Sequence, residues 1–171
     1  GEGSQFDFTL ELEQSQQSTS VMPEIRITGR EILIVDDNET NRIMLHDQLT
    51  LWGAVVTQAS SGQEALEVLN CRRADPFAAA IIDMQMPNMD GAQLGRAIRA
   101  DSEFDDMRLI MMTSMTERGD AQRFARLGFA AYFPKPTTTS DLFNALNVVL
   151  DGGEAMKNAA PLVTHHHLAQ M

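Results

Sequence analysis

The chain has 171 residues, of which 43% are hydrophobic, and a formal net charge of −11. Such an acidic chain argues against a nucleic-acid surface, which needs clustered Lys and Arg to displace counterions from phosphates, so we expect protein partners. The sequence shows no apolar run near the roughly 20 residues of a bilayer span and no signal peptide, and Cys71 is its one cysteine, which together favour a reducing cytoplasmic setting.

The N-terminal part of the chain divides into a strand-like segment and a linker. Residues 1–13 alternate apolar and polar side chains, which is typical of a half-buried strand; the apolar ones are Phe6, Phe8, Leu10 and Leu12. Residues 14–29 open with a stretch rich in Gln and Ser and are predicted to be a linker.

Residues 30–151 alternate short apolar runs with amphipathic stretches, which indicates repeated βα units in one domain. The apolar runs predict strands at 32–35, 54–57, 79–82, 109–112 and 130–133. The helices are expected at about 40–51, from a capping box at 61–64 through Leu69, around Leu94 to Ile98, around 121–127, and at about 140–150. Residues 152–171 are predicted to be a C-terminal linker or tail.

Polar residues follow four of the five predicted strands. Asp36 and Asp37 come directly after the first run, Asp83 after the third and Thr113 after the fourth, and Lys135 lies two residues beyond the last. A parallel sheet brings the carboxyl ends of its strands to one edge, where open α/β sheets bind ligands. The spacing therefore predicts one shared site.

The three aspartates predict a site for a divalent cation. Placed together, they would repel one another and raise the pKa of at least one of them, unless a cation joins them. Mg²⁺ suits carboxylate oxygens, and a backbone carbonyl just after Asp83 would complete the set. Asp83 stands alone at a strand end and is the best nucleophile, while Asp36 and Asp37 suit metal binding. Thr113 and Lys135 would donate to the transferred phosphoryl group.

These motifs together resemble a two-component response-regulator receiver domain. They read Ile-Leu-Ile-Val-Asp36-Asp37-Asn38, Ile-Ile-Asp83-Met-Gln-Met-Pro87, Met-Met-Thr113-Ser and Tyr132-Phe-Pro-Lys135-Pro136. The resemblance implies a flavodoxin-like (βα)5 fold, which is a doubly wound α/β architecture with a parallel five-stranded sheet of strand order 2-1-3-4-5.

The resemblance also implies a role for each residue of the site. Asp83 would be the phosphoacceptor, and Mg²⁺ would bind Asp37, Asp83 and the Gln85 carbonyl, with Asp36 acting mainly through a metal-bound water. Thr113 would contact the phosphoryl group, Lys135 would pair with it, and Tyr132 would change rotamer on phosphorylation. Core packing explains an aromatic residue at position 132 equally well.

The two ends suggest a larger parent protein. Residues 1–13 resemble the last glycine box and closing strand of a histidine-kinase ATP-binding domain, and residues 161–165 resemble a linker before a further receiver. The parent is therefore expected to be a membrane-anchored hybrid sensor kinase, and this part of it to have no kinase activity of its own. Its partners would be a histidine-kinase dimerisation domain, with a histidine-phosphotransfer domain or a second receiver as further candidates. The run His165–His167 is assigned no metal.

Two other classes of function stay open from the sequence. A pseudo-receiver would dock to a kinase without being phosphorylated, although loss of Asp83 or Lys135 would be expected there. A flavin binder or an aspartate-nucleophile phosphohydrolase would share the topology. Flavin phosphate, however, would be repelled by Asp36 and Asp37. The hydrolase pattern has a second acid two residues after the nucleophile, where this chain has Gln85.

Overall fold

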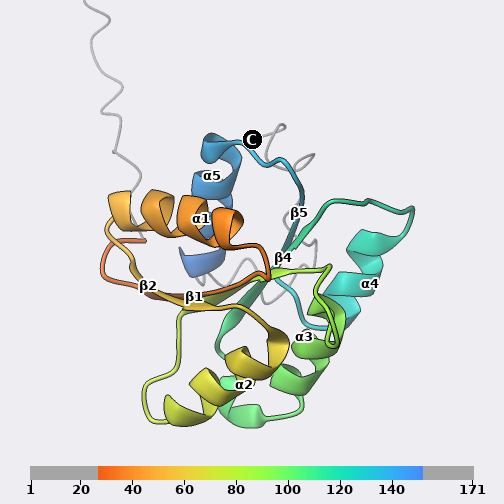
Figure 1. Ribbon diagram of the computed structural model, residues 1–171, viewed down its shortest axis with the longest axis horizontal. Coiled ribbons are helices and arrows are strands. Elements are labelled where there is room, and N and C mark those ends of the chain that lie inside the picture. The colour runs from red at the N-terminus through yellow and green to blue at the C-terminus, as the bar shows by residue number, and fades with distance from the viewer. Residues whose placement is uncertain (1–26, 152–171) are drawn as a thin grey trace, which may run out of the picture.

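The computed structural model describes residues 27–151 (Figure 1), as one sheet with helices on both faces. The elements in chain order are β1 Glu31–Val35, α1 Glu39–Leu51, β2 Val55–Ala59, α2 Gly62–Cys71, β3 Ala79–Asp83, α3 Gly91–Arg99, a 3-10 turn Ser102–Phe104, β4 Arg108–Thr113, α4 Asp120–Arg126, β5 Ala131–Pro134 and α5 Thr139–Asp151. The predictions for residues 1–13, for most of the 14–29 linker and for 152–171 lie outside the described residues.

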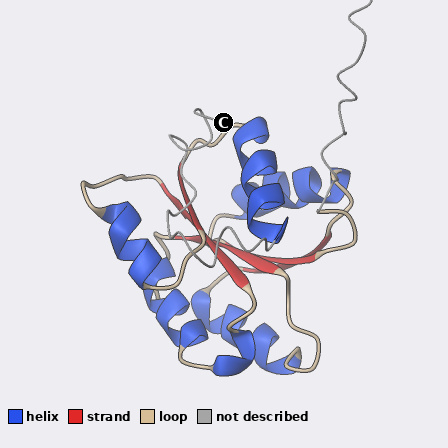
Figure 2. Ribbon diagram, turned by 180° about the vertical axis from the view of Figure 1, so that it is seen from behind, coloured by secondary structure: helices blue, strands red, loops and turns tan. Residues whose placement is uncertain are grey.

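All five strands pair in parallel, in the order β2-β1-β3-β4-β5. The predicted α/β fold and strand order are thus confirmed. Helices α1 and α5 cover one face of the sheet, and α2, α3 and α4 cover the other (Figures 1 and 2). Among residues 27–151, no helix is both long and apolar enough to span a bilayer.

The core consists of two apolar layers separated by the sheet. Side chains of β1 alternate between them, since Leu33 and Val35 pack with the α2, α3 and α4 side, whereas Ile32 and Ile34 pack with the α1 and α5 side. Parallel strands are covered on both faces and therefore appear in sequence as continuous apolar runs rather than alternating ones. This explains why the apolar runs in the sequence predict the strands, and why the ends of the runs mark one edge of the sheet.

The strand register brings the predicted site residues to that edge. Val35 pairs with Ile82, so the next residue on each strand, Asp36 on β1 and Asp83 on β3, lies at the same level of the sheet. Asp83 in turn pairs with Met112, one residue before Thr113. The order of the strands thus places β1 and β3 side by side at the centre of the sheet, with their acidic ends adjacent.

The capping box predicted at the start of α2 is only half formed. Ser61 accepts a hydrogen bond from the Glu64 backbone N–H at 3.1 Å, but the Glu64 carboxylate accepts from the N–H and hydroxyl of Ser60, both at 2.6 Å. Two donors on Ser60 outcompete the single N–H of Ser61. A complete box instead begins α3, where Asp90 and Gln93 cap each other at 2.8 and 2.9 Å.

Candidate functional site

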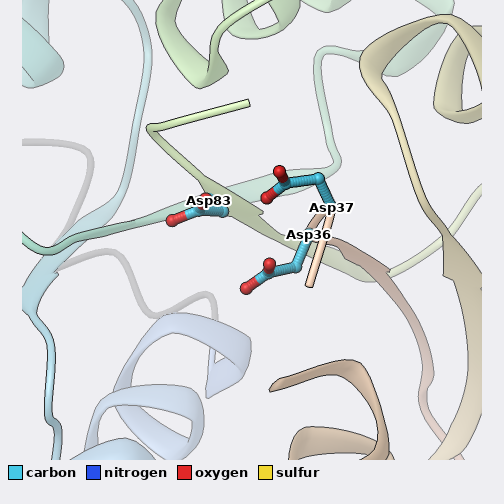
Figure 3. Close-up of side chains that lie close together, drawn as sticks. All are labelled: Asp36, Asp37 and Asp83. Atoms are coloured by element: carbon cyan, nitrogen blue, oxygen red, sulfur yellow. The ribbon is translucent and has the colours of Figure 1, made fainter. Parts of the chain in front are cut away.

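Three carboxylates meet where β1 and β3 end. Asp36 and Asp37 follow β1, and Asp83 is the last residue of β3, so that one oxygen of each lies within 4.8 Å of the others (Figure 3). Asp36 is 2% exposed and Asp83 is 6% exposed, whereas Asp37 is exposed to solvent. The cluster is therefore buried at Asp36 and Asp83 and open to solvent at Asp37.

Lys135 supplies the positive charge of this cluster. Its Nζ lies 2.9 Å from Asp36 Oδ2, to which it donates a hydrogen bond, and 2.9 Å from Asp83 Oδ1. The contact with Asp83 is an ion pair by distance, but within residues 27–151 no well-directed hydrogen bond reaches that buried oxygen. One ammonium is therefore shared between two carboxylates, and Asp83 Oδ1 is a buried acceptor that is incompletely satisfied.

The pKa values of the pair show that one lysine does not neutralise the site. Burial raises the pKa of Asp83, and the charges of Asp36 and Asp37 raise it further, which outweighs the opposing effect of Lys135. Burial lowers the pKa of Lys135, but its close contacts with the carboxylates of Asp83 and Asp36 raise it above its ordinary value. The net negative pocket therefore favours the binding of a cation.

This raised pKa predicts a pH dependence of stability in metal-free protein. The folded state binds more protons than the unfolded chain from the ordinary value of 3.8 up to the raised one, so the free energy of unfolding falls as pH rises through this window. Asp83→Asn removes the ionisable carboxyl and therefore this fall in the free energy of unfolding. Urea unfolding in EDTA should show the variant more stable than wild type at pH 7.5, with the difference shrinking toward pH 4. A difference that is constant over this range would contradict the role of burial.

The donor set of the cluster fits a hard divalent cation. Its ligand atoms are all carboxylate oxygens, which is the chemistry that Mg²⁺ and Ca²⁺ prefer, and one of the three carboxylates, Asp83, has an oxygen without a hydrogen bond. Gln85 is exposed, two residues beyond Asp83. The role of its carbonyl stays a prediction.

Thr113 and Tyr132 lie on the α4 side of the site. The Thr113 hydroxyl donates to the Met115 carbonyl at 2.7 Å and accepts from the Met115 N–H at 3.2 Å, so it is held by its own loop. Tyr132 is 8% exposed and packs in the core, with its ring centroid 5.2 Å from that of Phe124. Asp36, Asp37, Asp83 and Lys135 therefore form one cluster, while Thr113 and Tyr132 flank it.

A family model described as the response regulator receiver domain matches residues 32–147. The chain belongs to this family. It is a receiver domain of two-component phosphorelay signalling, which decides against the flavin-binding and phosphohydrolase alternatives, and neither the comparisons nor the site favours the pseudo-receiver alternative.

Similar proteins include both single receivers and long sensor kinases. The receiver domain is 32% identical over 119 residues to the probable chemotaxis protein CheY of Rhizobium etli, covering 69% of this chain and 90% of the relative. It is 34% identical over 143 residues to the sensor protein EvgS of Escherichia coli, covering 81% of this chain but 12% of that protein. The structure of CheY4 from Vibrio cholerae superposes with a TM-score of 0.66 at 29% identity, covering 71% of this chain and 99% of that one. The chain thus spans a small part of its kinase relatives and nearly all of the chemotaxis protein.

Glycine at position 91 lets α3 pack against the backbone of the receiver's central aspartate. A Cβ at this position would lie 2.5 Å from Asp83 O and 3.0 Å from Met84 Cα, and these backbone atoms cannot turn aside. At Gly95, one turn further along α3, a Cβ would instead meet the ring of Phe129, at 2.4 Å from Cε2.

We expect Gly91→Ala and Gly95→Ala to have similar effects on the free energy of unfolding but different effects on the rate of phosphorylation. Both should lower the free energy of unfolding by about 1–3 kcal/mol through overpacking. Only Gly91→Ala should also slow phosphorylation, because it displaces the Asp83 backbone. Urea unfolding and the rate of adduct formation measure the two effects, and equal phosphorylation rates in the two variants would contradict this account.

Sequence reasoning missed the donors that hold Asp36. The Asn38 N–H donates to Asp36 Oδ1 at 2.8 Å, and the Asn41 side-chain amide donates to Asp36 Oδ2 at 3.2 Å. Asn38 also caps α1 by accepting from the Asn41 N–H. An Asp followed at short spacing by two Asn residues is a signal of such local bonding.

Proposed function

We propose that Asp83 accepts a phosphoryl group from a phosphohistidine of a kinase. The observation that carries this proposal is a buried carboxylate at a strand end, in ion-pair contact with Lys135 and with one oxygen short of a hydrogen bond. A carboxylate oxygen of Asp83 would form the new P–O bond while the P–N bond to imidazole breaks. The bonding electron pair returns to the ring nitrogen, and the product is an acyl phosphate.

Asp36, Asp37 and Asp83 would hold Mg²⁺, with the Gln85 carbonyl as a further ligand and Asp36 acting mainly through a metal-bound water. When bound, Mg²⁺ would neutralise charge on the phosphoryl oxygens and the repulsion among the carboxylates. The open side of the cluster at Asp37 provides access for both the ion and the phosphodonor.

The remaining residues of the site would stabilise and report the new charge. Lys135 would move its contact from the Asp83 carboxylate to a phosphoryl oxygen. Thr113 would exchange its bond to the Met115 carbonyl for one to the phosphoryl group, drawing the loop after β4 toward the site. Tyr132 packs against Phe124 of α4 and would change rotamer in response.

The setting that we propose is the cytoplasmic part of a hybrid sensor kinase. Similarity to EvgS supports it, and so does the likeness of residues 1–13 to the end of a kinase ATP-binding domain. The phosphoryl group would come from the kinase dimerisation domain and pass to a histidine-phosphotransfer domain or a second receiver. This chain would not itself transfer phosphate from ATP.

Removal of the metal tests this function. Incubation with phosphoramidate, a small P–N donor, should give one phosphoryl adduct by intact mass in Mg²⁺. EDTA should lower the rate at least about 100-fold, because the carboxylates then repel the incoming phosphoryl group. Restoring Mg²⁺, but not Na⁺ at the same ionic strength, should restore the rate. An adduct that forms equally fast in EDTA would overturn the metal-assisted mechanism.

A further inference from the structure

Asp36 is held by more protein donors than any other carboxylate of the cluster. Its Oδ1 accepts from the Asn38 N–H at 2.8 Å, and its Oδ2 accepts from both Lys135 Nζ at 2.9 Å and Asn41 Nδ2 at 3.2 Å. Because a carboxylate oxygen only accepts, the Asn41 atom that faces it is the NH₂ group. The side chain of Asp36 is thus fixed from both oxygens in a buried setting.

The first turn of α1 also holds the backbone of the same residue. Arg42, next to Asn41, donates from Nη1 to the Asp36 carbonyl at 2.7 Å. The loop after β1 is therefore also held by a hydrogen bond that does not involve the Asn41 amide. What Asn41 provides is a second hydrogen-bond donor to Asp36 Oδ2, beside the ammonium of Lys135.

That oxygen shares the ammonium of Lys135 with Asp83. The ammonium lies 2.9 Å from Asp36 Oδ2 and 2.9 Å from Asp83 Oδ1, but its hydrogen bond goes to Asp36. A second donor on Asp36 Oδ2 partly satisfies the oxygen and weakens its hold on the ammonium. Without that donor, we expect Lys135 to bind Asp36 more tightly and its contact with Asp83 to lengthen.

We propose that Asn41 is a positioning residue, which keeps Lys135 available to Asp83 by donating a hydrogen bond to Asp36. The consequence for phosphoryl transfer rests on the proposed function of Asp83. The placement of Lys135 itself does not, so it can be measured separately.

The test compares Asn41→Ala with Gln48→Ala. Both amides are on α1 and line the same groove of about 360 Å³ between α1 and α5, but the hydrogen bond to Asp36 comes from Asn41. We expect the phosphorylation rate at saturating Mg²⁺ to fall about tenfold in Asn41→Ala, and the dissociation constant for Mg²⁺ measured by calorimetry to stay within about threefold. Gln48→Ala should change neither. A fall in rate and metal affinity together, or a rate within twofold of wild type, would overturn the proposal.

A second measurement works even if the protein is not phosphorylated. The sequence has two lysines, Lys135 and Lys157, so lysine-labelled protein gives a simple NMR spectrum in which Lys135→Met identifies the Lys135 signal. In metal-free Asn41→Ala, this signal should shift, while Gln48→Ala leaves it in place and both variants keep the wild-type unfolding midpoint within a few degrees. An unshifted Lys135 signal in Asn41→Ala would refute the inference. Absence of any adduct in folded wild type would instead refute the proposed function.

Discussion

Asp83→Asn is expected to abolish phosphoryl adduct formation with phosphoramidate. An amide oxygen is a poor nucleophile, and the other two aspartates of the cluster have other roles, since Asp36 accepts hydrogen bonds at both oxygens and Asp37 is proposed as a ligand of Mg²⁺. Intact mass after incubation in Mg²⁺ should show one adduct in wild type and none in the variant. The loss is not a folding effect, because removing the buried charge is expected to raise stability at neutral pH.

Asp106→Asn is the matched control for this loss. Asp106 is exposed and precedes β4, so it lies at the opposite edge of the sheet from the cluster. The Asp106→Asn variant should be phosphorylated at the wild-type rate. An adduct that persists in Asp83→Asn at that rate would show that another residue is the acceptor.

Lys135→Met is expected to slow phosphorylation by about 100- to 1,000-fold, which is the usual effect of removing one preorganised donor from a developing anion. Affinity for Mg²⁺ should stay the same or rise, because the variant removes a cation that competes for Asp36 and Asp83. Stopped incubations analysed by mass give the rate, and calorimetry gives the affinity. The opposite pattern, with weak Mg²⁺ binding and a normal rate at saturation, would show that Lys135 only shapes the metal site.

Arg108→Met controls for loss of one positive charge. Arg108 begins β4 at the edge of the sheet away from the cluster. Its loss should leave the phosphorylation rate within about threefold, since charges separated by more than a Debye length of about 8–10 Å are largely screened. Lys135→Arg is not expected to restore the rate, because a planar guanidinium fork cannot take the place of a compact ammonium between two carboxylates.

The sequence predicted the sheet and the acidic cluster well, for a common physical reason. Buried parallel strands leave continuous apolar runs, and the polar residue that ends each run marks the ligand-binding edge. The positions of Asp36, Asp37, Asp83 and Lys135 after such runs therefore predict one cluster, and the structure brings these residues together.

What the sequence did not predict depends on side-chain geometry. The capping partner of Glu64 was assigned to Ser61 rather than Ser60, because two adjacent serines offer similar donors and only the local backbone selects between them. The bond from Asn41 to Asp36 depends on where α1 begins relative to β1, which periodicity fixes only to within a few residues. The hold of Met115 on the Thr113 hydroxyl is likewise set by a loop conformation.

The most direct test of the central claim is to locate the phosphoryl group on the chain. Wild-type protein would be phosphorylated with phosphoramidate in Mg²⁺ and reduced with borohydride, which converts an aspartyl phosphate to homoserine, and its peptides would then be sequenced by mass spectrometry. The account predicts homoserine in place of aspartate at position 83, and at no other position, with no conversion when Mg²⁺ is withheld. Homoserine at Asp36 or Asp37, or a phosphoryl adduct that borohydride does not reduce, would contradict it.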